Sequence, residues 1–491
     1  MNRKMAYAVV VLTLALGMGC AKRHSVVVPK APEKNVVDLA AWVPREADVV
    51  VVVSSLEALK TSFEQLKTRS SFKQLEEVLE TLPKEMEEEA GIEFFTLSTW
   101  QEMGFDIHAP LMLGVDTRAE TVLLMAFPVA DQTQLLASIE KHLVAKEKWE
   151  AQPGMPQGTY AWKARFNNFV FLEQQPGHVL VFLGDDLEAL QKRAQLPKEK
   201  SWAGHKDILL KIDSRLPAGR VASVWLRMDE NKVEEVEWVG AALVTHPRVK
   251  VVADITWRPG KKPLLPRMQT ASFESKQWSQ GLGNAMGGLW SSVEWDWYIQ
   301  LLKQHASRDL GFEMIEMLGI ILKQNLEPPV FARGLTQATQ EDEEAFLGSV
   351  DILLKKGSSA EQFLNALAPL MTEGKIEATQ LNAKTSVWKT QLGGRELMVQ
   401  SLAQNKIRIS DSAYSEEEGT PNALQKELMR EMTSYPLAAA LHLNALLELP
   451  QFRFLFGRRP LARAEYILLG FRAEEDHAQL MGEHFAEVGL R

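Results

Sequence analysis

Cys20 is the only cysteine in the 491-residue chain, and its position favours covalent attachment of lipid. It follows a basic start at Arg3, an apolar run over residues 5–16 and the small residue Gly19. Secretory signals have this order: a basic segment, an apolar core of about 7–15 residues and small residues at the cleavage site. Without a second cysteine, the chain has neither a disulfide nor a cysteine-based metal site.

The segment resembles the lipobox of bacterial lipoproteins, in which a cysteine becomes the first mature residue and carries the lipid. The resemblance implies removal of residues 1–19, palmitate-type acyl chains on Cys20 and an anchor in the cell envelope. Leu16 precedes by one position the usual place of the lipobox leucine, where Gly17 stands. An ordinary cleaved signal is the alternative. Because Ala21 is not acidic, we expect the outer membrane and its periplasmic face.

Other residues that could bind a cofactor or a metal ion lack the spacing that such a site requires. Gly281 and Gly283 begin a dinucleotide-type loop, but Met286 occupies the place of its third glycine. His477 and His484 lie seven apart on an expected last helix, whereas helical zinc pairs use four-residue spacing. The acidic runs lack the pattern of a calcium loop. We therefore predict no catalytic residue, no metal and no cofactor.

An aromatic-rich segment is the sequence's best candidate for a binding or docking patch. Its members lie within about twenty positions of one another: Trp278, Trp290, Trp295, Trp297 and Tyr298. Tryptophan is enriched at interfaces because the indole is apolar and carries one hydrogen-bond donor. The alternative is that these side chains form the core of the surrounding domain.

Composition narrows the range of partners. The net charge of −9 argues against nucleic acid, which basic proteins bind by neutralising phosphates. The hydrophobic share of 46% is typical of globular cores. No later apolar run reaches the 18 residues or so of a membrane span. Residues 20–35 are polar and contain prolines, which predicts a flexible tether behind the lipidated cysteine.

Internal similarity predicts the elements that carry these residues. The stretches 162–185 and 388–411 align without a gap, and their alternation predicts two or three antiparallel strands each. Apolar strands follow Pro44, Pro217 and Pro436. Each strand ends near Ser, Asp or Asn, which are preferred helix N-caps, so we expect a helix after each.

These similarities predict an α+β fold of tandem repeated units, each an antiparallel sheet with packed helices. We expect a first unit at 36–205, a second with an insert at 206–425 and a truncated third at 426–491. The pattern over most of residues 40–200 resembles a bacterial envelope family known only as a domain of unknown function. That resemblance implies no catalytic residues.

The sequence therefore favours a membrane-anchored envelope lipoprotein that acts as a non-enzymatic binding or scaffold protein. Its partners would be the lipid bilayer, through Cys20, and another envelope protein. A carrier of a hydrophobic ligand, with the aromatic segment as its pocket, is the first alternative. An enzyme without a recognisable motif is the second.

Overall fold

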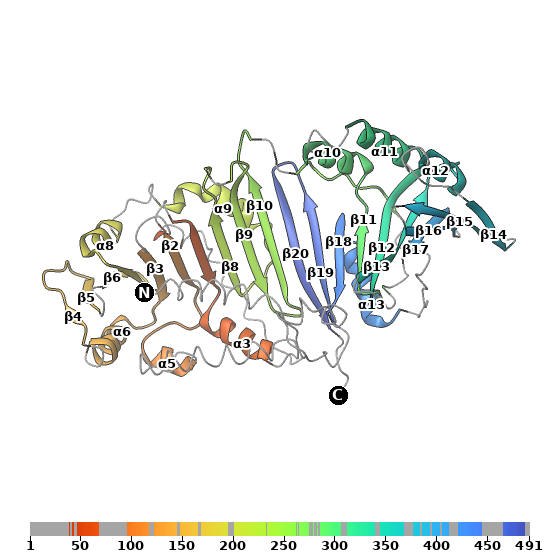
Figure 1. Ribbon diagram of the computed structural model, residues 1–491. Coiled ribbons are helices and arrows are strands. Elements are labelled where there is room, and N and C mark those ends of the chain that lie inside the picture. The colour runs from red at the N-terminus through yellow and green to blue at the C-terminus, as the bar shows by residue number, and fades with distance from the viewer. Residues whose placement is uncertain are drawn as a thin grey trace. The chain divides into compact units, whose positions relative to one another are not determined.

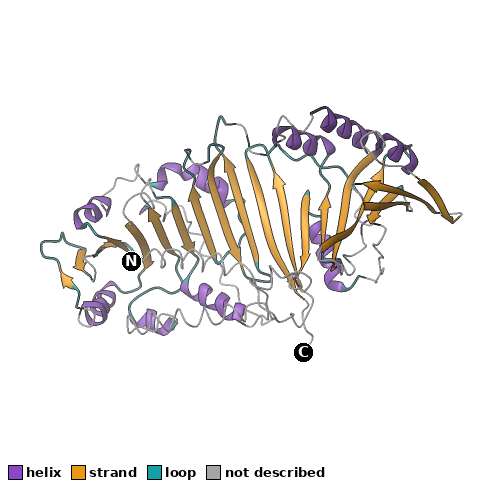
Figure 2. Ribbon diagram, in the orientation of Figure 1, coloured by secondary structure: helices purple, strands orange, loops and turns teal. Residues whose placement is uncertain are grey.

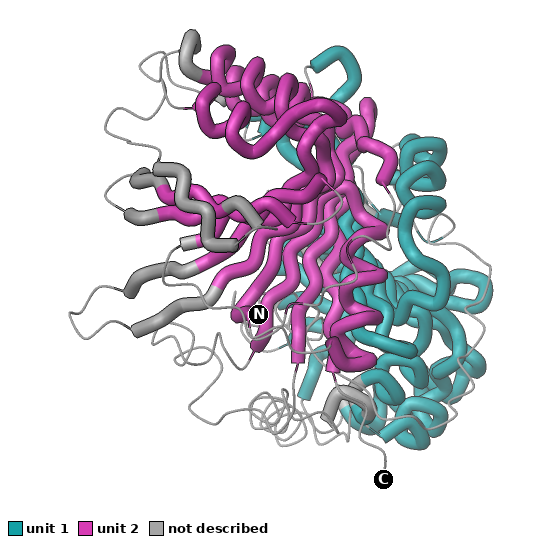
Figure 3. Tube along the Cα trace, turned by 90° about the vertical axis from the view of Figure 1, so that its right-hand side faces the viewer, with its two compact units in different colours: residues 1–262 teal, residues 263–491 magenta. Residues whose placement is uncertain are grey.

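A computed structural model divides the chain into two compact units, Met1–Lys262 and Pro263–Arg491 (Figures 1 and 3). Each unit is described here by itself. The structure describes residues 39, 42–43, 47–67, 96–116, 122–144, 148–164, 168–194, 201–231, 233–261, 263, 265–273, 278, 282, 285–305, 312–338, 344–367, 377–382, 385–392, 395–402, 405–411, 421–443 and 465–486. Residues 1–38, which include the predicted signal, Cys20 and the predicted tether, lie outside this description.

The described strands of the first unit form one antiparallel sheet. Across the sheet their order is β4 (Glu150–Ala151), β5 (Thr159–Lys163), β6 (Phe169–Gln175), β7 (His178–Gly184), β3 (Val122–Pro128), β2 (Leu111–Asp116), β1 (Val49–Val53), β8 (Ala222–Arg227), β9 (Val236–Val244) and β10 (Lys250–Trp257). The described helices are α3 (Leu56–Lys67), α5 (Leu97–Glu102), α6 (Gln132–Ile139) with the π-helical η3 (Glu140–Val144), α8 (Leu187–Ala194), the 3₁₀ helix η6 (Trp202–His205) and α9 (Lys206–Asp213).

Local sequence explains the first strand and helix. The five residues of β1 are all valine, a β-branched residue that packs well on a pleated surface. The strand ends at Val53, and the Ser55 hydroxyl accepts a hydrogen bond of 3.0 Å from the Ala58 N–H. This contact satisfies one of the free amides at the start of α3. The predicted strand and the helix after it are confirmed.

The core of the first unit lies on both faces of β1. On one face, Val51 packs with β8 and β9, and Leu59 of α3 lies against the same cluster. The hydroxyls of Ser62 and Thr245 are 2.9 Å apart and join α3 to the end of β9. On the other face, Val50 and Val52 are buried. The central strand is therefore covered on both sides.

The described strands of the second unit pair in the same order as those of the first. The order is β14 (Glu377–Asn382), β15 (Thr385–Leu392), β16 (Arg395–Ser401), β17 (Lys406–Asp411), β13 (Glu344–Leu354), β12 (Leu326–Ala338), β11 (Gly287–Ser291), β18 (Leu437–His442), β19 (Glu465–Ala473) and β20 (His477–Ala486). All of these pairs are antiparallel.

Helices cover different parts of the two faces of this second sheet (Figure 2). The described helices are α10 (Trp295–His305), α11 (Phe312–Asn325), α12 (Ala360–Leu367) and α13 (Ala423–Met432). Ile321 of α11 and Phe363 of α12 pack with Ile352 and Ile407 of the sheet. On the opposite face, Gln425 of α13 donates a hydrogen bond to the Tyr466 hydroxyl. No described helix is both long and apolar enough to cross a membrane.

The predicted fold class of tandem α+β units with a truncated third is wrong. The structure is dominated by large antiparallel sheet, and the predicted units do not stand alone within it. Strand β8, assigned to the predicted second unit, pairs directly with β1. Strand β18, assigned to the predicted third unit, pairs directly with β11. The proline-led segments look alike because each is a buried strand of such a sheet.

Two predicted helices are strands or loops instead. After β8, the Asp229 carboxylate accepts the Asn231 N–H at 3.0 Å, which closes a turn, and the chain returns as β9. The segment with His477 and His484 is strand β20, which pairs antiparallel with β19 over residues 478–486. The two histidines are seven positions apart, so the alternation of the strand places them on opposite faces. A side chain that caps a helix also forms a turn, so Asp229 alone did not fix the outcome.

We predict that Gly470→Ala destabilises the second unit by about 1–3 kcal/mol, because overpacking forces neighbouring atoms to move. A Cβ at Gly470 would lie 2.7 Å from atoms of the Tyr435 ring. Gly482→Ala in the adjacent strand is the matched control, since its Cβ would meet Leu469 at 3.7 Å, an ordinary contact. Denaturant unfolding of both variants measures the difference, and equal stabilities would contradict this packing.

Candidate functional site in the second unit

The structure separates the five aromatic residues proposed as a patch into two groups. Trp278 and Trp290 lie together on one face of the sheet, with ring centroids 5.4 Å apart, and both are buried. Trp295, Trp297 and Tyr298 belong to α10. The set does not form one exposed surface, and its two groups have different surroundings.

The aromatic residues of α10 are tied to neighbouring chain. Buried Trp297 donates its indole N–H to the Pro266 carbonyl at 2.8 Å, and Trp295 donates to the Leu326 carbonyl at 3.0 Å. The Tyr298 hydroxyl forms a short hydrogen bond with Ser291. Burial raises the pKa of the Tyr298 phenol. These contacts hold α10 against the start of β12 and the end of β11.

Three exposed leucines lie on one face of the same sheet. Leu289 of β11 is 48% exposed, Leu469 of β19 is 40% exposed and Leu480 of β20 is 44% exposed. Leu289 stands opposite Ala439, which stands opposite Leu469, so these side chains form one row across β11, β18 and β19. Leu480 adjoins this row from β20, opposite Phe471. We call the surface formed by Leu289, Leu469 and Leu480 the open apolar face.

The first unit covers the corresponding place. Val51 is the third residue of β1, as Leu289 is of β11, but Val51 is only 4% exposed. Leu59 of α3 packs on the cluster that contains Val51. An exposed row of large apolar side chains is uncommon on monomeric proteins and marks an interaction site. The open apolar face is therefore the candidate docking surface.

The sequence indicated the aromatic segment as a candidate binding patch, but it did not indicate the leucines of β19 and β20. A usable signal was present, because residues 466–471 are apolar on both alternating faces except for Gly470. A strand with apolar side chains on both faces is usually packed against other parts of the protein on both faces. The sequence did not reveal which side lacks a cover.

A cluster of charged residues is buried beneath the other face of the second sheet. The Asp351 carboxylate of β13 accepts two hydrogen bonds from Arg408 of β17, at 2.7 and 3.0 Å. It also accepts one from Arg333 of β12 at 3.2 Å. Lys406 lies with its ammonium 4.4 Å from the centroid of the Trp278 ring. We call these four charged residues the buried charged cluster.

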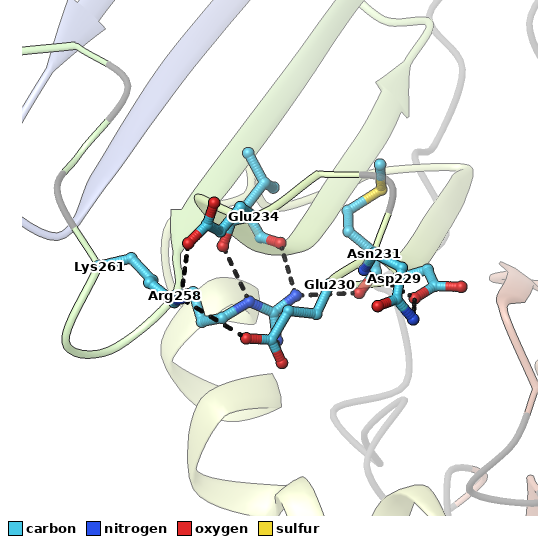
Figure 4. Close-up of polar contacts among 8 residues, drawn as sticks. Asp229, Glu230, Asn231, Glu234, Arg258 and Lys261 are labelled. Carbon is cyan, nitrogen blue, oxygen red and sulfur yellow. Dashed lines mark hydrogen bonds and ion pairs between the residues drawn. The ribbon is translucent and has the colours of Figure 1, made fainter.

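In a polar network of the first unit, an arginine side chain donates hydrogen bonds to backbone carbonyls (Figure 4). The Arg258 guanidinium donates to the carbonyls of Met228, Glu234 and Val236 at 3.1–3.2 Å. Lys261 donates to the Glu234 carboxylate at 2.7 Å, and this hydrogen bond lowers the pKa of that carboxyl. The network holds the β8–β9 connection against the end of β10.

The two histidines of β20 do not assemble a metal site. His484 is buried and its Nε2 lies 3.0 Å from a Glu465 oxygen, whereas His477 contacts Asp476 at 2.9 Å. Within the part of the chain that the structure describes, no three histidine, cysteine, aspartate or glutamate side chains gather as ligands. Cys20, the predicted lipidation site, lies outside the described residues.

Comparisons of the chain with protein-family models, curated proteins and solved structures found no match.

We predict that His484 makes the second unit less stable in mild acid. Burial lowers the pKa of its imidazole to about 4, below the ordinary value of 6.5. Because the unfolded chain binds the proton at a higher pH than the folded chain, stability falls as the pH drops from 6.5 towards 4. Between pH 6.5 and pH 5 the loss is roughly 2 kcal/mol.

Denaturant unfolding of the native protein and of His484→Gln at pH 7.5, 6.5 and 5 measures this loss. The variant is expected to lose less stability than the native protein over that range. His108→Gln is the control, because the His108 side chain is 61% exposed. If both substitutions leave the pH dependence unchanged, His484 is not the responsible group.

Proposed function

We propose that this protein is a non-enzymatic binding protein, anchored through lipidated Cys20 to the bacterial outer membrane and facing the periplasm. The signal-like order of residues 1–20 supports the anchor, and the uncharged Ala21 supports the outer membrane. The open apolar face supports binding, because its three exposed leucines occupy neighbouring strands of a well-packed sheet. That row is the observation on which the binding proposal depends.

The proposed occupant of the open apolar face is an amphipathic helix of an envelope protein. In the first unit the equivalent face is covered by α3, whose Leu59 packs against the buried cluster that contains Val51 and Val53. An apolar stripe along one side of a helix is complementary to a row of side chains on a sheet. The open apolar face offers Leu289 and Leu469 for the same kind of contact.

A protein helix suits this surface better than an enclosed small ligand. Ligand sites are concave and bury most of a ligand's surface. The open apolar face is a row on a pleated sheet, with Ala439 at its middle between Leu289 and Leu469. A partner on such a surface would make a long, shallow contact. A helix lying across the strands makes a contact of this shape.

We expect a photo-crosslinking amino acid at position 469 to capture one envelope protein in intact cells. Mass spectrometry is expected to map the adduct to an amphipathic helix of that partner. Leu289→Asp should abolish the adduct, because a buried carboxylate without a partner costs several kcal/mol. The crosslinker at position 210 is the matched control, since Leu210 is an exposed leucine of the first unit.

Three results would contradict the docking proposal. They are an adduct with a second copy of this chain, an adduct with lipid alone, and an adduct at 469 that persists in Leu289→Asp. The lipid adduct would favour a carrier of hydrophobic ligands instead. Circular dichroism of Leu289→Asp checks that its fold is intact, and Leu480→Asp repeats the test from a different strand.

We also expect Cys20→Ala to release the protein from membranes. Cells labelled with an alkyne analogue of palmitate should incorporate the label into the native protein and not into the variant. Fractionation should move the variant to the soluble periplasm, because removal of the acyl chains removes the anchoring energy of about 0.8 kcal/mol per buried methylene. Labelling that persists in Cys20→Ala would overturn the lipoprotein assignment.

A further inference from the structure

Three members of the buried charged cluster, Arg333, Asp351 and Arg408, occupy positions that carry no charge in the first unit. In the second unit, Phe331 of β12 stands opposite Asp351 of β13, which stands opposite Arg408 of β17. The corresponding row of the first unit is Met112, Ala126 and Leu180, on β2, β3 and β7. Both rows are buried.

The next row shows the same replacement. Arg333 stands opposite Ser349, which stands opposite Ser410. The first unit has Gly114, Leu124 and Phe182 in this row. The first unit therefore builds this strand order with an apolar interior.

Burying charged side chains in such an interior carries a large desolvation penalty. Replacing a buried ion pair by apolar residues of similar volume is often neutral or stabilising. Arg333, Asp351 and Arg408 are at most 7% exposed, and they lie where the first unit uses apolar contacts. The folding of the sheet alone does not account for them.

Several buried donors on the same face also lack a partner. The Ser349 hydroxyl and the indole N–H groups of Trp278 and Trp290 form no hydrogen bond within the structure. Each of these residues is at most 3% exposed. A buried donor without a partner costs about 1–3 kcal/mol, so an acceptor from outside the chain would stabilise these three groups.

Lys406 brings a further positive charge to the two tryptophans. Its ammonium lies over the Trp278 ring, and Trp278 lies against Trp290. Burial lowers the pKa of Lys406, which Asp351 partly offsets. An anion near the ammonium would favour its charged form.

We propose that the buried charged cluster of the second unit binds the anionic group of a small molecule, a carboxylate or a phosphate. Arg333, Arg408 and Lys406 supply positive charge, and Ser349, Trp278 and Trp290 supply hydrogen-bond donors. Asp351 orients the two guanidinium groups through the contacts already described. This site is on the opposite face of the sheet from the open apolar face, so it does not depend on the docking proposal.

Thermal unfolding of the purified mature protein tests the site with two probes, sodium phosphate and sodium butyrate. Sodium chloride at matched ionic strength provides the baseline. We expect a saturable rise in Tm with one probe, and the more effective probe identifies the anion class. Lys406→Met should weaken the apparent affinity about tenfold or more, because a positive charge beside the anion is lost.

Lys303→Met is the matched control, since Lys303 is an exposed lysine of the same unit paired with Glu316. Its response should equal that of the native protein. Ser349→Ala is the second test, because it removes a hydroxyl with no hydrogen bond in the structure and should preserve the fold while weakening the affinity. Circular dichroism checks both site variants, and Ser349→Ala decides the matter if Lys406→Met is unfolded.

Absence of a saturable shift beyond that of chloride, with either probe, would overturn the proposal. An unchanged response in folded Lys406→Met or in Ser349→Ala would also overturn it.

Discussion

The structure of each unit depends on a short central strand that must be paired on both edges and that has apolar side chains on both faces, which favour burial. Strand β1 lies between β2 and β8, and β11 lies between β12 and β18. The partner strands are far apart in sequence, so the central strand joins the early and late parts of its unit into one sheet. Backbone groups buried in this way need every one of these pairings, because an unpaired buried group costs free energy.

The two units meet the second demand differently. In the first, α3 covers the face of β1 that carries Val51. In the second, α11 and α12 pack on β12, β13 and β17, and the leucines of β11, β19 and β20 are left exposed. The same strand order is thus compatible with a sheet face that a helix covers and with a sheet face that is exposed. The difference between them gives the second unit a surface that folding does not use.

The interiors differ as well. The rows that contain Met112 and Leu124 are apolar, whereas the rows that contain Asp351 and Arg333 are charged or polar. The charged interior is held by directed contacts, since Asp351 accepts hydrogen bonds from two arginines. Directed contacts of this kind fix the positions of the three side chains.

The sequence by itself determined the local elements. The run of valines predicted β1, and Ser55 marked the start of α3. The alternation over residues 162–185 predicted two or three strands, and β6 and β7 lie there. The proposal of a lipid anchor at Cys20 also comes from the sequence alone, because no other cysteine competes for that role. These features depend on neighbours in the chain, whose chemistry is visible in the sequence.

Only the tertiary structure decided which strands are neighbours and which faces are covered. The alternation of β8 and β18 shows that they are buried strands, but it does not show that they pair with β1 and β11. Arg333, Asp351 and Arg408 stand far apart in the chain, and they meet because three strands place them in adjacent rows. Leu469 is exposed for the same reason: a side chain's surroundings are set by long-range pairing, which the sequence of one strand does not contain.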